Sequence, residues 1–222
     1  MFKRIMLGLA LAGALIGGQA AAAEQTVIVL NVDGQSINFP VPKGLCPATG
    51  LYAEVADRVA KLDDVNDTVL TLYSCADMAA QNFDLGNYLI VKAPKGMRGQ
   101  TLPLATLLDA YRQSPEMFGK AVDEAVDTKE LGKDFSEAFE EKITVGGGIK
   151  VAGADAGGIY LVGAIEMQGE ERKTVTSLAT GVTSVKGKIL GINLYGPGGD
   201  GEVAKRLRET KATVAATLAA NK

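Results

Sequence analysis

The sequence contains no histidine and no tryptophan, only two cysteines, and just 5% aromatic residues among its 222 positions. Without histidine the chain has no Ser-His or Cys-His nucleophile pair and no imidazole for metal binding or proton transfer. Most familiar hydrolase mechanisms are therefore excluded. The sequence is 47% hydrophobic and 22% charged, with a formal net charge of −3, which is the composition of a folded protein. No cluster of residues indicates a particular reaction, and we expect no cofactor and no metal.

The longest apolar run lies near the amino terminus, where two basic residues precede the stretch over residues 5–16. Small residues follow it, and those that end at Ala23 satisfy the A-x-A rule for signal peptidase. This order predicts a secretory signal peptide over residues 1–23, cleaved near Ala23, and a single globular domain over residues 24–222. The apolar run is shorter than the ~20 residues of a membrane-spanning helix. We therefore expect a periplasmic or secreted protein with no stable membrane insertion.

The remaining chain carries no block of lysine or arginine. Removal of the two basic residues of the predicted signal peptide leaves it more acidic than the whole sequence. Nucleic acids and anionic membranes attract basic surfaces, so we expect neither as a partner. A protein of the cell envelope is the partner that export predicts.

Cys46 and Cys75 are the only two cysteines of the chain. In an oxidising compartment an isolated pair of this kind predicts a disulfide. The alternative is a redox-active pair, but reactive dithiols usually have the C-x-x-C spacing, which is absent here.

Apolar periodicity predicts the order of the elements. Aliphatic and β-branched runs flank Asp33-Gly34, a pair that favours a tight hairpin turn. Residues 51–62 have the apolar spacing of an amphipathic helix, and the nearly continuous apolar run at 87–92 predicts a buried central strand. After residue 142, four strand-like segments with short Gly-rich or charged connections predict an antiparallel meander.

We therefore predict an α+β fold, an antiparallel sheet flanked by helices in an α/β/α sandwich-like arrangement. Thr101, Pro103 and Asp200 are expected at helix starts, the last of them as an N-cap. The final helix has a sparse apolar stripe of Val203, Leu207, Val214 and Leu218. The expected strands are 26–32, 36–41, 68–75, 87–92, 143–151, 158–167, 172–182 and 186–195, and the expected helices are 51–62, 103–114, 115–126, 133–142 and 202–220.

Three acidic or glycine-rich features are candidate sites. The loop over residues 196–201 lies between a strand and a helix and could hold an anion, but it lacks the Lys-Ser or Lys-Thr of a phosphate loop, and helix capping explains it. The cluster of Asp63, Asp64 and Asp67 has no partner ligands at metal-binding spacing. A glycosidase-like carboxylate pair remains an alternative, with candidates among Asp123, Glu124, Asp127, Glu137, Glu140 and Glu141.

Residues 92–99 form the best candidate contact segment. Lys92, Lys95 and Arg98 concentrate positive charge there, and Met97 lies between them. Such a segment would contact an acidic protein surface or a carboxylate. The alternative is a solvated connection shaped by glycine and proline.

The order of the expected elements resembles that of the PsbP-like family of α/β/α sandwiches. This order is a hairpin with an FPVPKG edge at residues 39–44, a helix, paired strands, a later meander and a closing helix. The resemblance implies an antiparallel sheet between helical layers and a non-catalytic role in binding or assisting another protein. We therefore predict an exported, soluble, non-catalytic binding or accessory protein of the bacterial cell envelope. The alternatives are a histidine-free, carboxylate-based hydrolase acting on envelope glycan and a carrier of a small apolar ligand.

Overall fold

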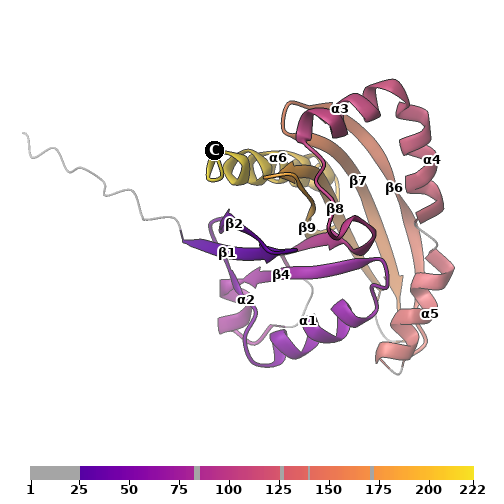
Figure 1. Ribbon diagram of the computed structural model, residues 1–222. Coiled ribbons are helices and arrows are strands. Elements are labelled where there is room, and N and C mark those ends of the chain that lie inside the picture. The colour runs from indigo at the N-terminus through magenta and orange to yellow at the C-terminus, as the bar shows by residue number, and fades with distance from the viewer. Residues whose placement is uncertain (1–25, 83–85, 126–127, 140, 171–172) are drawn as a thin grey trace, which may run out of the picture.

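The computed structural model describes residues 26–82, 86–125, 128–139, 141–170 and 173–222 (Figure 1). The predicted signal peptide lies outside these residues. The strands form one two-stranded and one seven-stranded sheet, all pairs antiparallel, which confirms the predicted α+β class. The strands are β1 (Val27–Val32), β2 (Gln35–Pro40), β3 (Leu45–Pro47), β4 (Asn66–Ser74), β5 (Tyr88–Pro94), β6 (Thr144–Asp155), β7 (Gly158–Gln168), β8 (Lys173–Val185) and β9 (Lys188–Pro197).

The helices fall into three groups along the chain. Helices α1 and α2 lie next to β4, α3 to α5 form the connection between β5 and β6, and α6 closes the chain (Figure 1). Their bounds are α1 (Leu51–Lys61), α2 (Cys75–Ala79), η1 (Lys95–Met97), α3 (Leu104–Gln113), α4 (Pro115–Ala125), α5 (Thr128–Phe139) and α6 (Glu202–Ala219).

The β1–β2 hairpin turns where the sequence predicts. Asp33 and Gly34 both have positive φ angles, 51° and 79°, as a two-residue turn of the primed type requires. Leu30 and Val32 point inward, whereas Val29 is 64% exposed, which is the alternation expected of a strand with one buried face.

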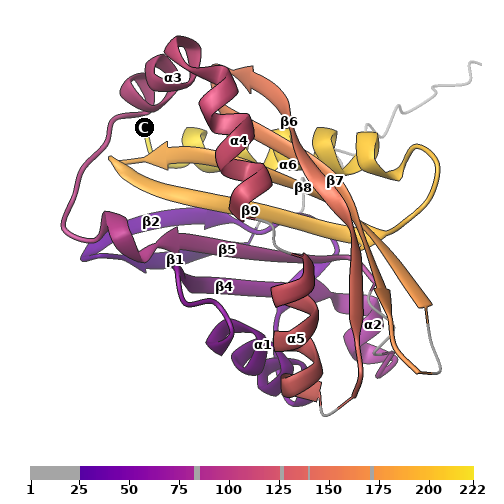
Figure 2. The same ribbon diagram turned by 90° about the vertical axis from the view of Figure 1, so that its right-hand side faces the viewer.

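The large sheet has the strand order β3-β4-β5-β9-β8-β7-β6. The predicted meander is confirmed, because β6 to β9 pair in succession, and the central place of β5 is confirmed by its buried Leu89, Ile90 and Val91. Strand β5 lies between β4 and β9, so the pairing of β5 with β9 joins the first half of the chain to the second half (Figure 2).

The two faces of the large sheet bear different helices. Leu190 and Ile192 of β9 belong to the core cluster that contains Val214 of α6 and the hairpin residue Phe39. Ile189, one position away along β9, packs instead with the cluster of α3. Since successive strand residues point to opposite faces, α6 and the hairpin cover one face and α3 covers the other.

Three helix starts differ from the predictions. Gly201, with φ of 77°, occupies the N-cap of α6 in place of Asp200, and no side chain caps that helix. Pro103, not Thr101, precedes α3. Cys75 begins the short helix α2 rather than ending a strand, because the Ser74 hydroxyl accepts a hydrogen bond from the amide of Asp77 and starts a helical turn there.

The buried stripe of α6 is also more polar than predicted. Val214 is fully buried, but the expected Val203, Leu207 and Leu218 are only half-buried. Apart from Arg206, the other buried positions are threonines, whose hydroxyls donate to backbone carbonyls of the helix or of β8. These are Thr210, Thr213 and Thr217, which donate to Ala179 O, Glu209 O and Thr213 O.

Candidate functional site

The predicted disulfide is present. Cys46 of β3 and Cys75 of α2 are joined, with their Cα atoms 5.2 Å apart. Beside the bridge, the amide of Cys75 donates to Gly44 O at 2.9 Å, and Leu45 pairs with Ser74 in the sheet. The bridge therefore attaches the segment after β2 to the end of β4.

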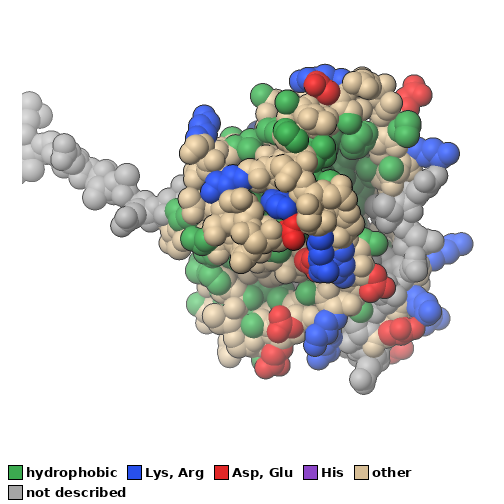
Figure 3. Space-filling view, in the orientation of Figure 1, with side chains coloured by type: hydrophobic (Ala, Val, Ile, Leu, Met, Phe, Trp, Pro, Cys, Tyr) green, Lys and Arg blue, Asp and Glu red, His purple; other side chains and the backbone are tan. Residues whose placement is uncertain are grey.

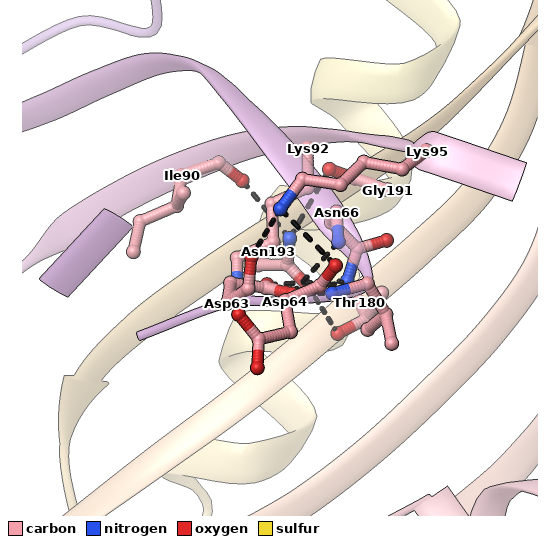
Figure 4. Close-up of polar contacts among 10 residues, drawn as sticks. Asp63, Asp64, Asn66, Ile90, Lys92, Lys95, Thr180, Gly191 and Asn193 are labelled. Carbon is pink, nitrogen blue, oxygen red and sulfur yellow. Dashed lines mark hydrogen bonds and ion pairs between the residues drawn. The ribbon is translucent and has the colours of Figure 1, made fainter. Parts of the chain in front are cut away.

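The candidate contact segment is not a free loop. Lys92 lies within β5, Lys95 and Met97 are in the helical turn η1, and Arg98 follows it. The segment packs against the turn after α1 that carries the acidic cluster (Figure 4). Met97 is half-buried there.

Each cation of this segment has a partner in the acidic cluster of Asp63, Asp64 and Asp67. Lys92 Nζ lies 2.6 Å from Asp63 Oδ2, and Lys95 Nζ donates to the carbonyl of Asp63 at 2.7 Å (Figure 4). The Arg98 guanidinium donates to both carboxylate oxygens of Asp67. The basic segment and the acidic cluster, which are separate in the sequence, thus form one ion-paired surface.

A buried polar cluster lies on the strands behind this surface. Thr180 Oγ1 donates to Asn193 Oδ1 at 2.8 Å, and Asn193 Nδ2 donates to the carbonyls of Ile90 and Gly191, each at 3.1 Å (Figure 4). The cluster bonds β8, β9 and β5 to one another and satisfies the Asn193 carboxamide, which identifies it as part of the sheet's framework.

The ionisation of Asp63 is coupled to the fold. Burial disfavours its charged form, but hydrogen bonds from Lys92 and Asn66 outweigh burial and hold the pKa of the carboxyl below its usual value. A carboxyl with a lowered folded-state pKa stabilises the protein above the unfolded-state pKa, and this stabilisation is lost as the pH falls through the folded-state pKa.

We therefore predict that Asp63→Asn lowers the free energy of unfolding at pH 7 by about 2 kcal/mol, the value of hydrogen bonds to a charged group. The difference from the wild-type protein should shrink as the pH falls below 4. Asp64→Asn is the matched control, because the Asp64 side chain is exposed and the lysine bond goes to its backbone carbonyl. Urea unfolding at several pH values measures both, and equal losses in the two variants would contradict the prediction.

A row of tyrosines crosses the α3 side of the sheet. Tyr73, Tyr88 and Tyr195 lie opposite one another on β4, β5 and β9, and the rings of Tyr88 and Tyr195 stack with centroids 4.5 Å apart. Tyr52 of α1 extends the row, 5.0 Å from Tyr73. Burial raises the pKa of all four hydroxyls, so these side chains are neutral at pH 7.

A pocket of about 680 Å³ opens on the other side of the molecule, between α6, the segment after β2 and the start of α2. We call it the α6 pocket. Its apolar lining consists of Pro40, Pro42, Leu45, Ala76, Leu194, Ala212 and Ala216. Its polar and charged lining includes Lys43, Asn87, Lys205, Arg206 and Glu209.

Arg206 is the most deeply buried charged residue of this lining, with 3% of its side chain exposed. Nη2 donates to Glu202 Oε2 at 3.2 Å, and Nη1 lies 2.7 Å from Glu209 Oε2. Helical spacing of four and three residues brings the three side chains together. Two atoms of the group have no hydrogen-bond partner among the described residues, Arg206 Nε and Glu209 Oε2, whose contact with Nη1 is close but poorly aligned.

Gly196 makes room for this arginine. A Cβ at Gly196 would lie 2.7 Å from Arg206 Cζ, closer than atoms can approach, so only glycine lets the guanidinium pack against β9. The glycine-rich loop is therefore explained by packing and helix entry. Its Gly198 amide donates to Val175 O at 2.7 Å.

Most candidates for the carboxylate pair of the hydrolase alternative have side chains that fall outside the described residues. Glu137 and Glu141 are exposed, while the side chains of Asp123, Glu124, Asp127 and Glu140 lie outside the described part. Within that part, no three acidic or cysteine side chains gather as a metal site, and no helix is long and apolar enough to cross a membrane.

The surface charges are mixed in sign. On the face in Figure 3, lysine and arginine side chains alternate with aspartate and glutamate, and no large area of one sign is present on that face. No protein-family model matches the chain, and no curated protein matches it.

Sequence reasoning missed the α6 pocket. The spacing of Glu202, Arg206 and Glu209 on a predicted helix was a readable signal for ion pairs. The burial of Arg206 was not readable, because it depends on Gly196 of another element and on a wall built from residues 40–45.

Proposed function

We propose that this chain is an exported, non-catalytic binding protein of the bacterial cell envelope that holds a small ligand in the α6 pocket. The observation that carries the proposal is the pocket itself, about 680 Å³ in volume and mostly apolar in lining, with a few convergent charged groups. Sites for small molecules have volumes of ~300–1,000 Å³ and this kind of lining.

The disulfide supports the same proposal. It joins Cys46 and Cys75, while Gly44, Leu45, Ser74 and Ala76 beside them line the pocket. A covalent link therefore holds two walls together, and a prearranged site loses less entropy when a ligand binds. A disulfide also fits an exported protein.

The ligand that this pocket favours differs from the wholly apolar one of the carrier hypothesis. An apolar part can contact the proline, leucine and alanine walls, while Arg206, Lys205 and Glu209 require a polar group. The non-catalytic role implied by the PsbP-like resemblance agrees with this proposal, and an envelope partner would receive or deliver the ligand.

The proposal predicts that the native protein carries a small molecule. The mature chain should be isolated from the envelope fraction of expressing cells and measured by native mass spectrometry, before and after organic extraction. We expect a discrete added mass that extraction removes, together with a lower thermal unfolding temperature of the extracted protein. A single unliganded mass, unchanged by the addition of envelope extract, would contradict the proposal.

A further inference from the structure

We infer that the free edge of β1 is a docking site for an extended segment of another protein, which joins the β1–β2 hairpin as a third strand. The inference concerns this strand edge and does not depend on what the α6 pocket binds. It is carried by the outward backbone groups of β1, by the way the protein closes its other strand edges, and by apolar surface beside β1.

The backbone groups of alternate residues in β1 point away from β2. The amide of Val41 donates to Thr26 O at 2.8 Å, and in an antiparallel pair this bonding repeats at every second residue. Val27, Val29 and Asn31 therefore direct their N–H and C=O groups outward. In the part of the chain that the structure describes, no hydrogen bond uses these groups.

The opposite edge of the same hairpin is closed by side chains. Asn221, which follows α6, donates from Nδ2 to Asn38 O at 2.7 Å and accepts from the Asn38 amide at 2.9 Å. Its carboxamide thus bonds the edge of β2 as a neighbouring strand would. On the same edge, Lys186 Nζ donates to Ser36 O at 2.9 Å. The β2 edge is therefore occupied, and only the β1 edge of the hairpin is open.

The outer strands of the large sheet also carry features that discourage pairing. Strand β6 has positive φ angles at Gly147 and Gly153 and the charged Lys150 between them, and β3 has only three residues. Proteins protect exposed edges with irregularities, charges and short strands of this kind. Strand β1 has none of them, because its six residues, VIVLNV, include no charge, no proline and no positive φ angle. Its edge is regular and apolar, as strand pairing requires.

Apolar surface continues beside this edge. Strand β2 lies next to α6, whereas β1 lies against β4, so the free edge of β1 faces the outer part of the large sheet (Figure 1). There Val69 and Leu70 of β4 pack against the hairpin core but keep part of their surface exposed. On the outer face of the hairpin, Val27 is 50% and Val29 is 64% exposed. An added strand can therefore bury apolar side chains on both of its faces.

The same arrangement favours a lone strand over a second copy of the chain. Two copies that pair antiparallel through β1 are related by a two-fold axis normal to the hairpin, so their large sheets lie on the same side. Paired strands are ~4.8 Å apart, and β3 and β4 of the two copies would then collide. An extended segment that brings no sheet of its own avoids this collision. Such segments bind exposed edges through main-chain hydrogen bonds, and alternate side chains give selectivity.

The test uses a synthetic peptide that presents one free strand edge. Valine and threonine alternate in it between terminal lysines, and every second amide is N-methylated, so that it pairs on one side only. The control peptide has the same side chains with all of its strand amides N-methylated. By fluorescence anisotropy with the purified protein, we expect the first peptide to bind at least about tenfold more tightly, because the control cannot donate main-chain hydrogen bonds. Hydrogen exchange at residues 26–32 should slow with the first peptide alone.

Variants locate the binding. Val29→Pro removes an outward N–H and leaves the hydrogen bonds between β1 and β2, because Val29 lies in a pair that is not hydrogen-bonded. It should abolish the difference between the peptides while the urea midpoint stays close to that of the wild-type protein. Val29→Lys places a charge on the edge and should weaken binding in the same way, which keeps the test valid if the proline variant does not fold. Met117→Lys is the matched control, because Met117 of α4 is apolar and 70% exposed.

The outcomes are distinct. Preferential binding of the first peptide with slowed exchange at residues 26–32 supports the inference. Equal binding of the two peptides, or no binding of either, overturns it, and so does a preference that survives in the folded Val29→Pro protein. A dimer of the wild-type protein that Val29→Pro dissociates, measured by sedimentation equilibrium, overturns it in favour of a second copy on β1. None of these results depends on a ligand in the α6 pocket.

Discussion

Replacement of both cysteines by alanine should lower the free energy of unfolding by about 3.6 kcal/mol. Cys46 and Cys75 are 29 residues apart, and the chain-entropy model assigns this amount to a loop of that length, because the bridge restricts the unfolded chain. That is a large share of the 5–15 kcal/mol typical of a folded domain. Urea unfolding followed by far-ultraviolet circular dichroism measures the loss.

The wild-type protein in reductant is the natural control for the double Cys→Ala variant. Both lack the bridge, so their unfolding midpoints should agree, and both should bind the pocket ligand more weakly because the wall after β2 is no longer attached. A double variant within about 1 kcal/mol of the oxidised protein would show that the bridge contributes little.

Phe39→Ala should cost about 4 kcal/mol, the magnitude for removal of a fully buried aromatic ring. Phe39 of β2 has no exposed surface and lies in the cluster that joins the hairpin to the large sheet and α6. Its loss leaves a cavity at the place where these three units meet. The free energy of unfolding, measured by urea titration, is the readout.

Val29→Ala is the matched control for this change. Val29 belongs to the same hairpin but is 64% exposed, so its truncation should change stability by no more than about 0.5 kcal/mol. If Phe39→Ala were as mild as Val29→Ala, the hairpin would not be part of the core.

Most of the fold could be predicted from local patterns. Alternation identified the hairpin and the four-stranded meander, and the unbroken apolar run of β5 identified a central strand, because these patterns depend only on neighbours in the sequence. Helix starts were predicted less well. Asp200 resembles an N-cap, but the backbone of Gly201 takes that position, and this conformation depends on how the loop leaves β9.

The sites were harder to predict because they depend on pairing between distant elements. Lys92, Lys95 and Arg98 are separated from their acidic partners by 29 to 32 positions in the sequence. Their hydrogen bonds form only when β4 and β5 pair. The tyrosine row likewise requires the register of three strands. The α6 pocket depends on the disulfide, on Gly196 and on α6 together. These features are far apart in the sequence, so residue spacing does not indicate that they lie side by side.

The proposed ligand of the α6 pocket is tested most directly by the ligand content of two variants substituted at neighbouring positions of α6. Ala216→Phe places a large ring in the pocket, whereas Ala215→Phe places it on the exposed side of the same helix. Native mass spectrometry of both proteins from envelope fractions should show the added mass retained in Ala215→Phe and lost in Ala216→Phe. Equal ligand content in the two folded variants would contradict the account.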